Sequence, residues 1–262
     1  MLNDFEMIVH KFPNREDITI IPISDVHLGS QECMESEFIE FINKVKETPD
    51  VYLVLGGDLI DNGVRNGLTN VFRATMPPSQ QKKEMANILA PVADRILAAT
   101  SGNHERRSGK DVDDDPAYDI MCKIDREEVY RENICFVKLQ FGEIEGDGMK
   151  NPTYMLCVAH GAGGGGQLTS GAVLRGERYG YAIDGCDALI IGHTHKPFIT
   201  NPGKIVIDPR NNKISVKPFR VISMTSWLKY GDYAAQKMLL PTTHSLQTLT
   251  LRGNKKEMVV RM

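Results

Sequence analysis

The chain has 262 residues, of which 41% are hydrophobic and 25% charged, and its formal net charge is −3 at pH 7. This length predicts one large domain, residues 1–262, with a substantial core. A weakly negative chain has no global positive field that would attract nucleic acid or an anionic membrane, so such binding would need a local patch. Without a basic and apolar leader or an apolar run of ~20 residues, we expect a soluble, cytoplasmic protein with no membrane partner.

The cysteines argue against a zinc ribbon and against a redox pair. The chain has five cysteines, which are scattered along it without a C-x-x-C spacing. We therefore expect reduced and mostly buried thiols at Cys33, Cys122, Cys135, Cys157 and Cys186.

Apolar runs of strand length alternate with helical patterns over the amino-terminal half, which is the order of βαβ units. The composition of most of these runs is typical of buried strands. The runs are Ile18–Ile23, Val51–Leu55, Ile96–Ala99, Tyr154–Ala159 and Ala188–Ile191.

Four helices are predicted between and after these runs. Phe38, Phe41, Ile42 and Val45 recur at helical spacing, which indicates an amphipathic helix on one face of a sheet. The other three are predicted over Pro77–Leu97 with Ser79 as N-cap and a kink at Pro91, from Asp115 as cap to Ile124, and from Ser170 towards Tyr181.

The pattern changes to short strand runs divided by turn residues from Lys204 onward. Asp208–Asn212 is a turn between the first two of these runs. We expect this β-rich end to supply a second sheet that packs against the first, with helices outside both. It also offers an edge for self-association.

Polar signatures follow the apolar runs directly. In open α/β sheets, ligands gather outside the carboxyl ends of the strands, so residues far apart in sequence can share one crevice. Alternation along an extended segment would put His193 and His195 on the same side. A lone histidine would be an ordinary surface or core residue, but five of the seven histidines lie in these signatures. The mixed carboxylate, amide and imidazole donors suit Mn, Fe, Zn or Ni better than calcium. The signatures are Ser24–His27, Gly56–Asp61, Ser101–Glu105, His160–Gly161 and Gly192–His195.

With D-x-H, G-D-x-x-D, G-N-H-E, a lone His-Gly and G-H-x-H in this order, the chain resembles the calcineurin-like metallophosphoesterases. The resemblance implies an α/β protein, a four-layer αββα sandwich of two mixed sheets flanked by helices, with two divalent metals at the strand carboxyl ends. By the resemblance, Asp25, His27 and His195 would hold the first metal, Asn103, His160 and His193 the second, and Asp58 would bridge them. It also implies that His104 is the catalytic histidine, oriented by Asp61, and Glu105 is expected to be a supporting structural carboxylate.

The implied reaction is hydrolysis of a phosphoester by a hydroxide that bridges two metals, with manganese as first choice and iron, zinc or nickel as alternatives. Protein serine/threonine phosphatases of this superfamily carry arginines where this chain has Asn62 and Ser101, so that subfamily is disfavoured. A phosphodiesterase acting on a nucleotide or another small diester ranks first and a DNA or RNA nuclease second. A phosphomonoesterase or protein phosphatase, and a non-catalytic metal-binding scaffold, stay open.

Three further segments bear on the substrate. Arg106 and Arg107 would contact a phosphate or belong to a solvated charged turn. The insertion Asn62–Gln81, with Arg65, Phe72 and Arg73, is the expected specificity element, in which Phe72 would either stack on a base or anchor the loop. The glycine run Gly161–Gly166 would approach a ligand, act as a lid or be a plain flexible loop. The natural substrate, the metals and the oligomeric state stay open.

Overall fold

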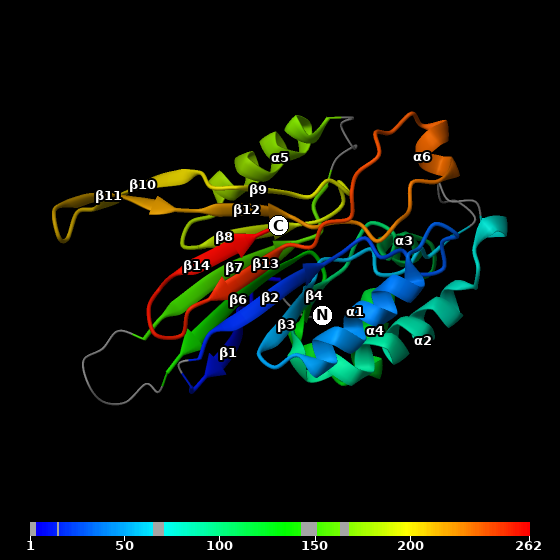
Figure 1. Ribbon diagram of the computed structural model, residues 1–262, viewed down its shortest axis with the longest axis horizontal. Helices are drawn as coiled ribbons and strands as arrows, with labels where there is room; N and C mark the ends of the chain where they lie inside the picture. Colours follow the sequence, from blue (N-terminus) through cyan, green and yellow to red (C-terminus); the bar gives the residue numbers. More distant parts are fainter. Residues whose placement is uncertain (1–3, 15, 65–70, 143–150, 163–167) are drawn as a thin grey trace.

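Two six-stranded mixed sheets lie face to face with helices on both outer sides, as the computed structural model shows (Figure 1). It describes residues 4–14, 16–64, 71–142, 151–162 and 168–262. The expected layering of helix, sheet, sheet and helix is therefore confirmed. No helix in these described ranges is long and apolar enough to cross a membrane.

The first sheet holds the early βαβ units. Its central strands run parallel because each is reached through a crossover, and β4 is buried along its whole length between helices and the second sheet. Two carboxyl-terminal strands extend it in antiparallel fashion. In spatial order the strands are β14 (Met258–Arg261), β13 (Thr248–Leu251), β2 (Ile18–Ile23), β3 (Val51–Leu55), β4 (Ile96–Thr100) and β5 (Tyr130–Arg131).

The second sheet is assembled from the middle of the chain plus the first strand. Its strands β7, β8 and β12 are parallel, so their carboxyl ends point the same way. In spatial order the strands are β1 (Ile8–Phe12), β6 (Ile134–Phe141), β7 (Thr153–Ala159), β8 (Ala188–Ile191), β12 (Arg220–Ser223) and β9 (Phe198–Thr200).

Helices α1 (Glu35–Glu47), α2 (Pro78–Leu89) and α4 (Pro116–Lys123) lie on the side of the first sheet, and α5 (Thr169–Ala182) covers the second (Figure 1). Short helices α3 (Arg106–Val112) and α6 (Asp232–Gln236) lie outside these layers. Helix α5 packs close to the sheet because Gly176 and Gly180 have no side chain there. A Cβ on Gly176 would collide with Val221, and one on Gly180 with Phe219. Short 3-10 turns complete the helices at Val71–Arg73, Ala90–Arg95 and Glu127–Val129.

Most local predictions are confirmed, with one wrong cap. The Asp115 side chain accepts a hydrogen bond from the backbone N–H of Tyr118 and starts α4. Helix α2 ends before Pro91 and continues as a 3-10 turn. Ser79 is not the N-cap, because the chain is already helical from Pro78, whose fixed φ suits the first helical position. The cysteines of the described chain are free, as expected, but only two are buried and three are half-buried, so the expectation of mostly buried thiols is wrong.

The carboxyl-terminal end does not form a sheet of its own, so that expectation is wrong. Strand β12 joins the second sheet, whereas β13 and β14 join the first. In the described part of the chain, strands β10 (Gly203–Asp208) and β11 (Lys213–Pro218) pair only with each other, and they project as a hairpin arm (Figure 1). The reason is burial: β12 carries consecutive buried residues, but every residue of β11 is exposed.

Candidate metal centre

The expected site residues converge where the parallel strands of both sheets end. The loops that leave β2, β3, β4, β7 and β8 carry them. The chain turns sharply there, because five of the expected ligands adopt a left-handed backbone with positive φ, a strained state that is concentrated at functional sites. These five are Asp25, His27, Asp58, His193 and His195. The histidines of Gly192–His195 therefore do not alternate along an extended segment, as the sequence suggested, but are aimed by two left-handed turns.

The first cluster joins Asp25, His27 and His195. The Nε2 atom of His195 lies 3.1 Å from Asp25 Oδ1 and 3.3 Å from Nε2 of His27. Asp25 is fully buried, and its Oδ1 has no hydrogen-bond partner among the residues that the structure describes. A buried carboxylate oxygen without a donor, beside two imidazole nitrogens, is an arrangement that a cation would satisfy.

The second cluster joins Asn103, His160 and His193. The Asn103 Oδ1 atom lies 3.0 Å from Nε2 of His160 and 2.6 Å from Nδ1 of His193. The other ring nitrogen of His160, Nδ1, is 2.7 Å from the carbonyl of Gly56, to which it donates. This bond aims Nε2 of His160 at the centre, where it could bind a metal once it loses its proton; second-sphere contacts of metal-binding histidines commonly have this effect.

One carboxylate oxygen of Asp58 lies between the two clusters. Its Oδ2 is 3.3 Å from Nε2 of His160 and 3.8 Å from Nε2 of His27. Its other oxygen, Oδ1, accepts the backbone N–H of His104 at 2.8 Å. The geometry therefore gives this single carboxylate access to both clusters, which is what the predicted bridging role requires.

The loop bearing Asp58 is packed against the loop bearing Asn103. A Cβ on Gly57, which has φ of 83°, would collide with the backbone of Gly102, and a Cβ on Gly102 would collide with Asp58. Glycine is thus required by close approach at both positions.

The donors fit two divalent cations. The carboxyl group of Asp25 has its pKa lowered because His195 outweighs the effect of burial, and that of Asp58 is lowered likewise by His160. Burial and nearby His104 lower the pKa of His27, which keeps it neutral. Ionised carboxylates and a neutral imidazole are the metal-binding forms, and donor separations near 3 Å match ligands ~2.0–2.2 Å from a shared ion.

His104 reaches the same centre from the start of α3. Its ring lies edge-on to that of His27, with centroids 4.3 Å apart, and its Nε2 is 3.9 Å from Asp58 Oδ2. Burial lowers the pKa of His104, but the Asp58 carboxylate and Asp61 outweigh it, so the net shift is upward. The contact with Asp61 runs chiefly through the backbone: Nδ1 is 2.7 Å from the carbonyl oxygen and 3.4 Å from carboxylate Oδ1.

Glu105 supports the site without facing it. Its fully buried carboxylate accepts backbone N–H groups from Asp58, Leu59 and Ile60 and from Gly102, at 2.7–3.2 Å. It therefore ties the Asp58 loop to the Asn103 loop, as expected of a structural carboxylate.

Asn62 is a residue whose role the sequence did not reveal. It is fully buried, and its Nδ2 donates to the carbonyl of His104 and to Oγ of Ser108, both at 2.8 Å. Its backbone N–H donates to Oε1 of buried Gln81, also at 2.8 Å. Asn62 thus fixes the backbone of His104, and the only signal for it was its place directly after the G-D-x-x-D motif.

A sixth strand end was also missed. The chain leaving β12 returns to the site, where the backbone N–H of Trp227 and the hydroxyl of Ser226 donate to the carbonyl of Asp25 at 3.0 and 3.1 Å. Trp227 is buried against Phe38 of α1, with ring centroids 5.0 Å apart. No motif in the sequence marks Ser226 and Trp227, which follow β12.

The residues proposed for substrate contact are not gathered at the metal centre as the expected ligands are. Arg106 and Arg107 start helix α3 rather than a charged turn. The guanidinium of Arg106 donates to the carbonyl of Ser101 at 2.9 Å, whereas that of Arg107 lies 3.4 Å from the carbonyl of Asp61. Phe72 is 94% exposed, so the alternative that it is a buried anchor is wrong. Arg65 and Gly163–Gly166 lie outside the described residues.

Two curated relatives match part of the chain. The chain is 33% identical over 109 residues to the DNA polymerase II small subunit of Pyrococcus furiosus, a stretch that covers 36% of this chain and 18% of that protein. The same subunit of Pyrococcus abyssi is 30% identical over 114 residues, covering 36% and 17%. The matched stretch therefore spans less than a fifth of these curated relatives.

Solved structures show similarity at low identity. A metallophosphoesterase from Sphaerobacter thermophilus has a TM-score of 0.39 and 15% identity, over 90% of this chain and 84% of that chain. Calcineurin-like phosphoesterase YfkN from Bacillus subtilis has a TM-score of 0.38 and 12% identity, over 94% and 90%. The sequence profile described as calcineurin-like phosphoesterase matches residues 18–197, which is more than half of the chain and includes every expected metal ligand. The chain therefore belongs to the calcineurin-like phosphoesterase family.

Proposed function

We propose that the chain is a metal-dependent phosphodiesterase that hydrolyses a nucleotide diester or another small phosphodiester. The observation that carries this proposal is the position of Asp58, whose Oδ2 lies between the two donor clusters and 3.9 Å from Nε2 of His104. Two donor clusters joined by one carboxylate, with an imidazole at the edge, suit hydrolysis at phosphorus.

Seven side chains would hold the two metal ions. Asp25, His27 and His195 would hold one ion, Asn103, His160 and His193 the other, and Asp58 both. Two divalent ions, with manganese as first choice, would supply an activated water and neutralise charge on the phosphate.

His104 would act as the general acid. Its Nδ1 faces the Asp61 carbonyl as a donor, so Nε2 points to the centre. The Asp58 and Asp61 carboxylates raise the pKa of His104 against the effect of burial, which favours the protonated ring. Donation of that proton to the leaving oxygen would be worth ~10²–10⁴ in rate. Asp61 and Asn62 hold the ring and its backbone in place.

The substrate would approach from the side of His195 and His104. The side chain of His195 is 36% exposed and that of His104 13%, whereas the ligands Asp25, Asp58 and His160 are at most 2% exposed. A diester is favoured because Asn62 and Ser101 stand where protein phosphatases of this superfamily, which act on monoesters, carry arginines that grip the phosphate. The guanidinium of Arg106 is committed to backbone carbonyls. Arg107 is the better of the two predicted substrate contacts.

The test is a panel of substrates with Mn²⁺: a bis-aryl phosphodiester, an aryl phosphomonoester, cyclic nucleotides, and single-stranded and duplex DNA. We expect the bis-aryl diester or a nucleotide diester to be hydrolysed fastest. Arg107→Ala should raise KM for the preferred substrate, whereas Arg178→Ala, which removes an exposed arginine of α5, should not. Monoester hydrolysis without diesterase activity would overturn the proposal.

A nuclease is the second candidate. The identity shared with the small subunit of a DNA polymerase over 109 residues favours it. DNA cleavage that exceeds hydrolysis of small diesters in the same panel would select it. Two bound metals without turnover of any substrate would instead support the non-catalytic scaffold. The cytoplasmic location expected from the sequence stays a prediction.

A further inference from the structure

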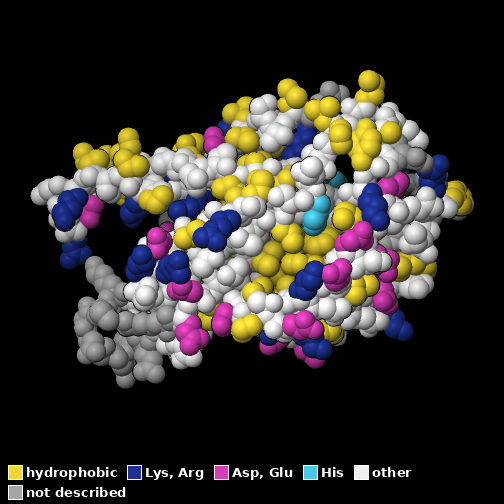
Figure 2. Space-filling model, in the orientation of Figure 1, with side chains coloured by type: hydrophobic (Ala, Val, Ile, Leu, Met, Phe, Trp, Pro, Cys, Tyr) yellow, Lys and Arg dark blue, Asp and Glu magenta, His cyan; other side chains and the backbone are white. Residues whose placement is uncertain are grey.

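The hairpin arm of β10 and β11 presents an aliphatic face to solvent. The register pairs Ile205 with Val216 and Ile207 with Ile214, so these four side chains share one side of the arm. Each is 69–75% exposed. Figure 2 shows apolar side chains gathered along this arm and on α5. A two-stranded hairpin is marginally stable in water, so an arm with this composition needs a surface to pack on.

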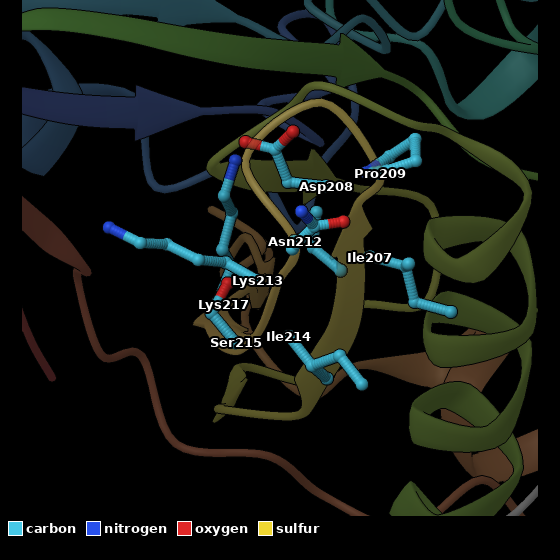
Figure 3. Close-up of a pocket in the computed structure, with 9 residues that line it drawn as sticks. Ile207, Asp208, Pro209, Asn212, Lys213, Ile214, Ser215 and Lys217 are labelled. Carbon is cyan, nitrogen blue, oxygen red and sulfur yellow. The ribbon is translucent and has the colours of Figure 1, made fainter.

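The two faces of the arm differ in character. Figure 3 shows Ile207 and Ile214 on the side where α5 lies, whereas Lys213 and Lys217 point away from it. The base of the arm is fixed to α5, because Nζ of Lys204 donates to the carbonyls of Gly180, at 2.7 Å, and of Ile183. These bonds attach the first strand of the arm to the carboxyl end of this helix through a residue of the polar face, which leaves the aliphatic face exposed.

Helix α5 also carries apolar side chains that are exposed to solvent. Leu174 and Tyr181 are seven residues apart, lie on the same side of the helix and are 59% and 56% exposed. Six residues of about 200 Å² each, roughly two-thirds exposed, offer on the order of 800 Å². That is the area which one partner contributes to a standard protein interface, roughly 800 Å².

We propose that this surface joins two copies of the chain about a two-fold axis, with the aliphatic faces of the two arms packed together. Two-fold contacts bring the same patch of each copy together, so the aliphatic face is its own partner. In an antiparallel arrangement, the tip of one arm, about 20 Å from its base, meets the end of α5 in the other copy. The charges are complementary there: the tip carries exposed Arg210, and exposed Asp184 follows α5.

Sedimentation equilibrium of the full chain, from 0.1 to 100 µM, tests this proposal. We expect a dimer with a dissociation constant on the order of 1 µM. Changing Ile205, Ile207, Ile214 and Val216 together to Thr keeps β-branched side chains and strand propensity but removes the aliphatic face. This variant should dissociate at least 100-fold more easily. Lys213→Thr/Lys217→Thr, on the opposite face, should dimerise as the parent does.

A charge exchange tests the antiparallel arrangement. Arg210→Asp should weaken the dimer about 10-fold, and Arg210→Asp/Asp184→Arg should restore it. A chain that stays monomeric at 100 µM would overturn the proposal, and so would a dimer that survives the four threonine changes. Thermal unfolding of each variant checks that the domain stays folded, since the arm lies outside both six-stranded sheets.

Discussion

Glu105→Gln is the substitution that most sharply tests how the site is built. The Oε2 atom accepts the N–H groups of Asp58 and Gly102, each at 2.9 Å, and Oε1 accepts those of Leu59 and Ile60, at 2.7 and 3.2 Å. Burial and the Asp58 carboxylate raise the pKa of Glu105, yet only the ionised form offers acceptors to all four donors. An amide would turn an NH₂ group towards two of them.

The expected loss follows from those two donors. An unsatisfied buried N–H costs ~1–3 kcal/mol, so the variant should lose on the order of 2–6 kcal/mol of stability. For a domain of this size, each kcal/mol lowers Tm by ~2–4 °C, which predicts a fall of roughly 5–20 °C. Because the bond to the backbone N–H of Asp58 positions the bridging carboxylate, Mn²⁺ affinity should fall as well.

Calorimetry with and without Mn²⁺ measures both effects. Glu47→Gln, an exposed residue at the end of α1, is the matched control and should change Tm by less than about 2 °C. An unchanged Tm for Glu105→Gln would refute the reasoning, since it would mean that the carboxyl group is protonated and that an amide replaces it without loss.

Three other predictions concern the chemistry of the centre. His104→Ala should keep both metals but lower kcat by ~10²–10⁴, and an undiminished kcat would exclude it as the acid. Asp61→Asn should cost less than 10-fold in kcat, because the backbone carbonyl that holds His104 remains; a loss as large as that of His104→Ala would show that the carboxylate does the orienting. In the metal-free protein, burial lowers the pKa of His160, but the Asp58 carboxylate raises it by more. The resulting pKa is about 9, so His160 is protonated at pH 7. Mn²⁺ binding should therefore release a proton, and Mn²⁺ affinity should rise as the pH increases from 7 to 9. Calorimetric titration in buffers of different protonation enthalpy measures this release. A binding enthalpy that does not depend on the buffer would contradict the prediction.

The sequence predicted the contents of the site because they depend on local order. Each ligand follows a strand, and these strands are parallel within each sheet, so their carboxyl ends meet at one edge of that sheet. Gly57 and Gly102 beside the ligands are also part of the local motifs, and the structure shows why glycine is needed there: the two loops approach each other closely. The orientation of His193 and His195 could not be predicted, because it depends on left-handed backbone angles at both residues, which the sequence pattern does not specify.

What the sequence could not predict depends on distant partners. Asn62 acts through an amide that bonds residues 42 to 46 positions away, and Trp227 through a contact with Asp25. The fate of the β-rich end depended on which strand edges were open, so β13 and β14 joined the first sheet, whereas the arm of β10 and β11 joined neither. Short alternating runs carry no information about the sheet that receives them.

A metal titration tests the central claim most directly. The chain stripped of metal is reloaded with Mn²⁺ while bound metal, by elemental analysis, and turnover of a bis-aryl phosphodiester are measured together. We predict that turnover rises to a plateau at two ions per chain, and that Asp58→Ala binds neither ion tightly and stays inactive. A plateau at one ion, or two ions retained by Asp58→Ala, would contradict the account.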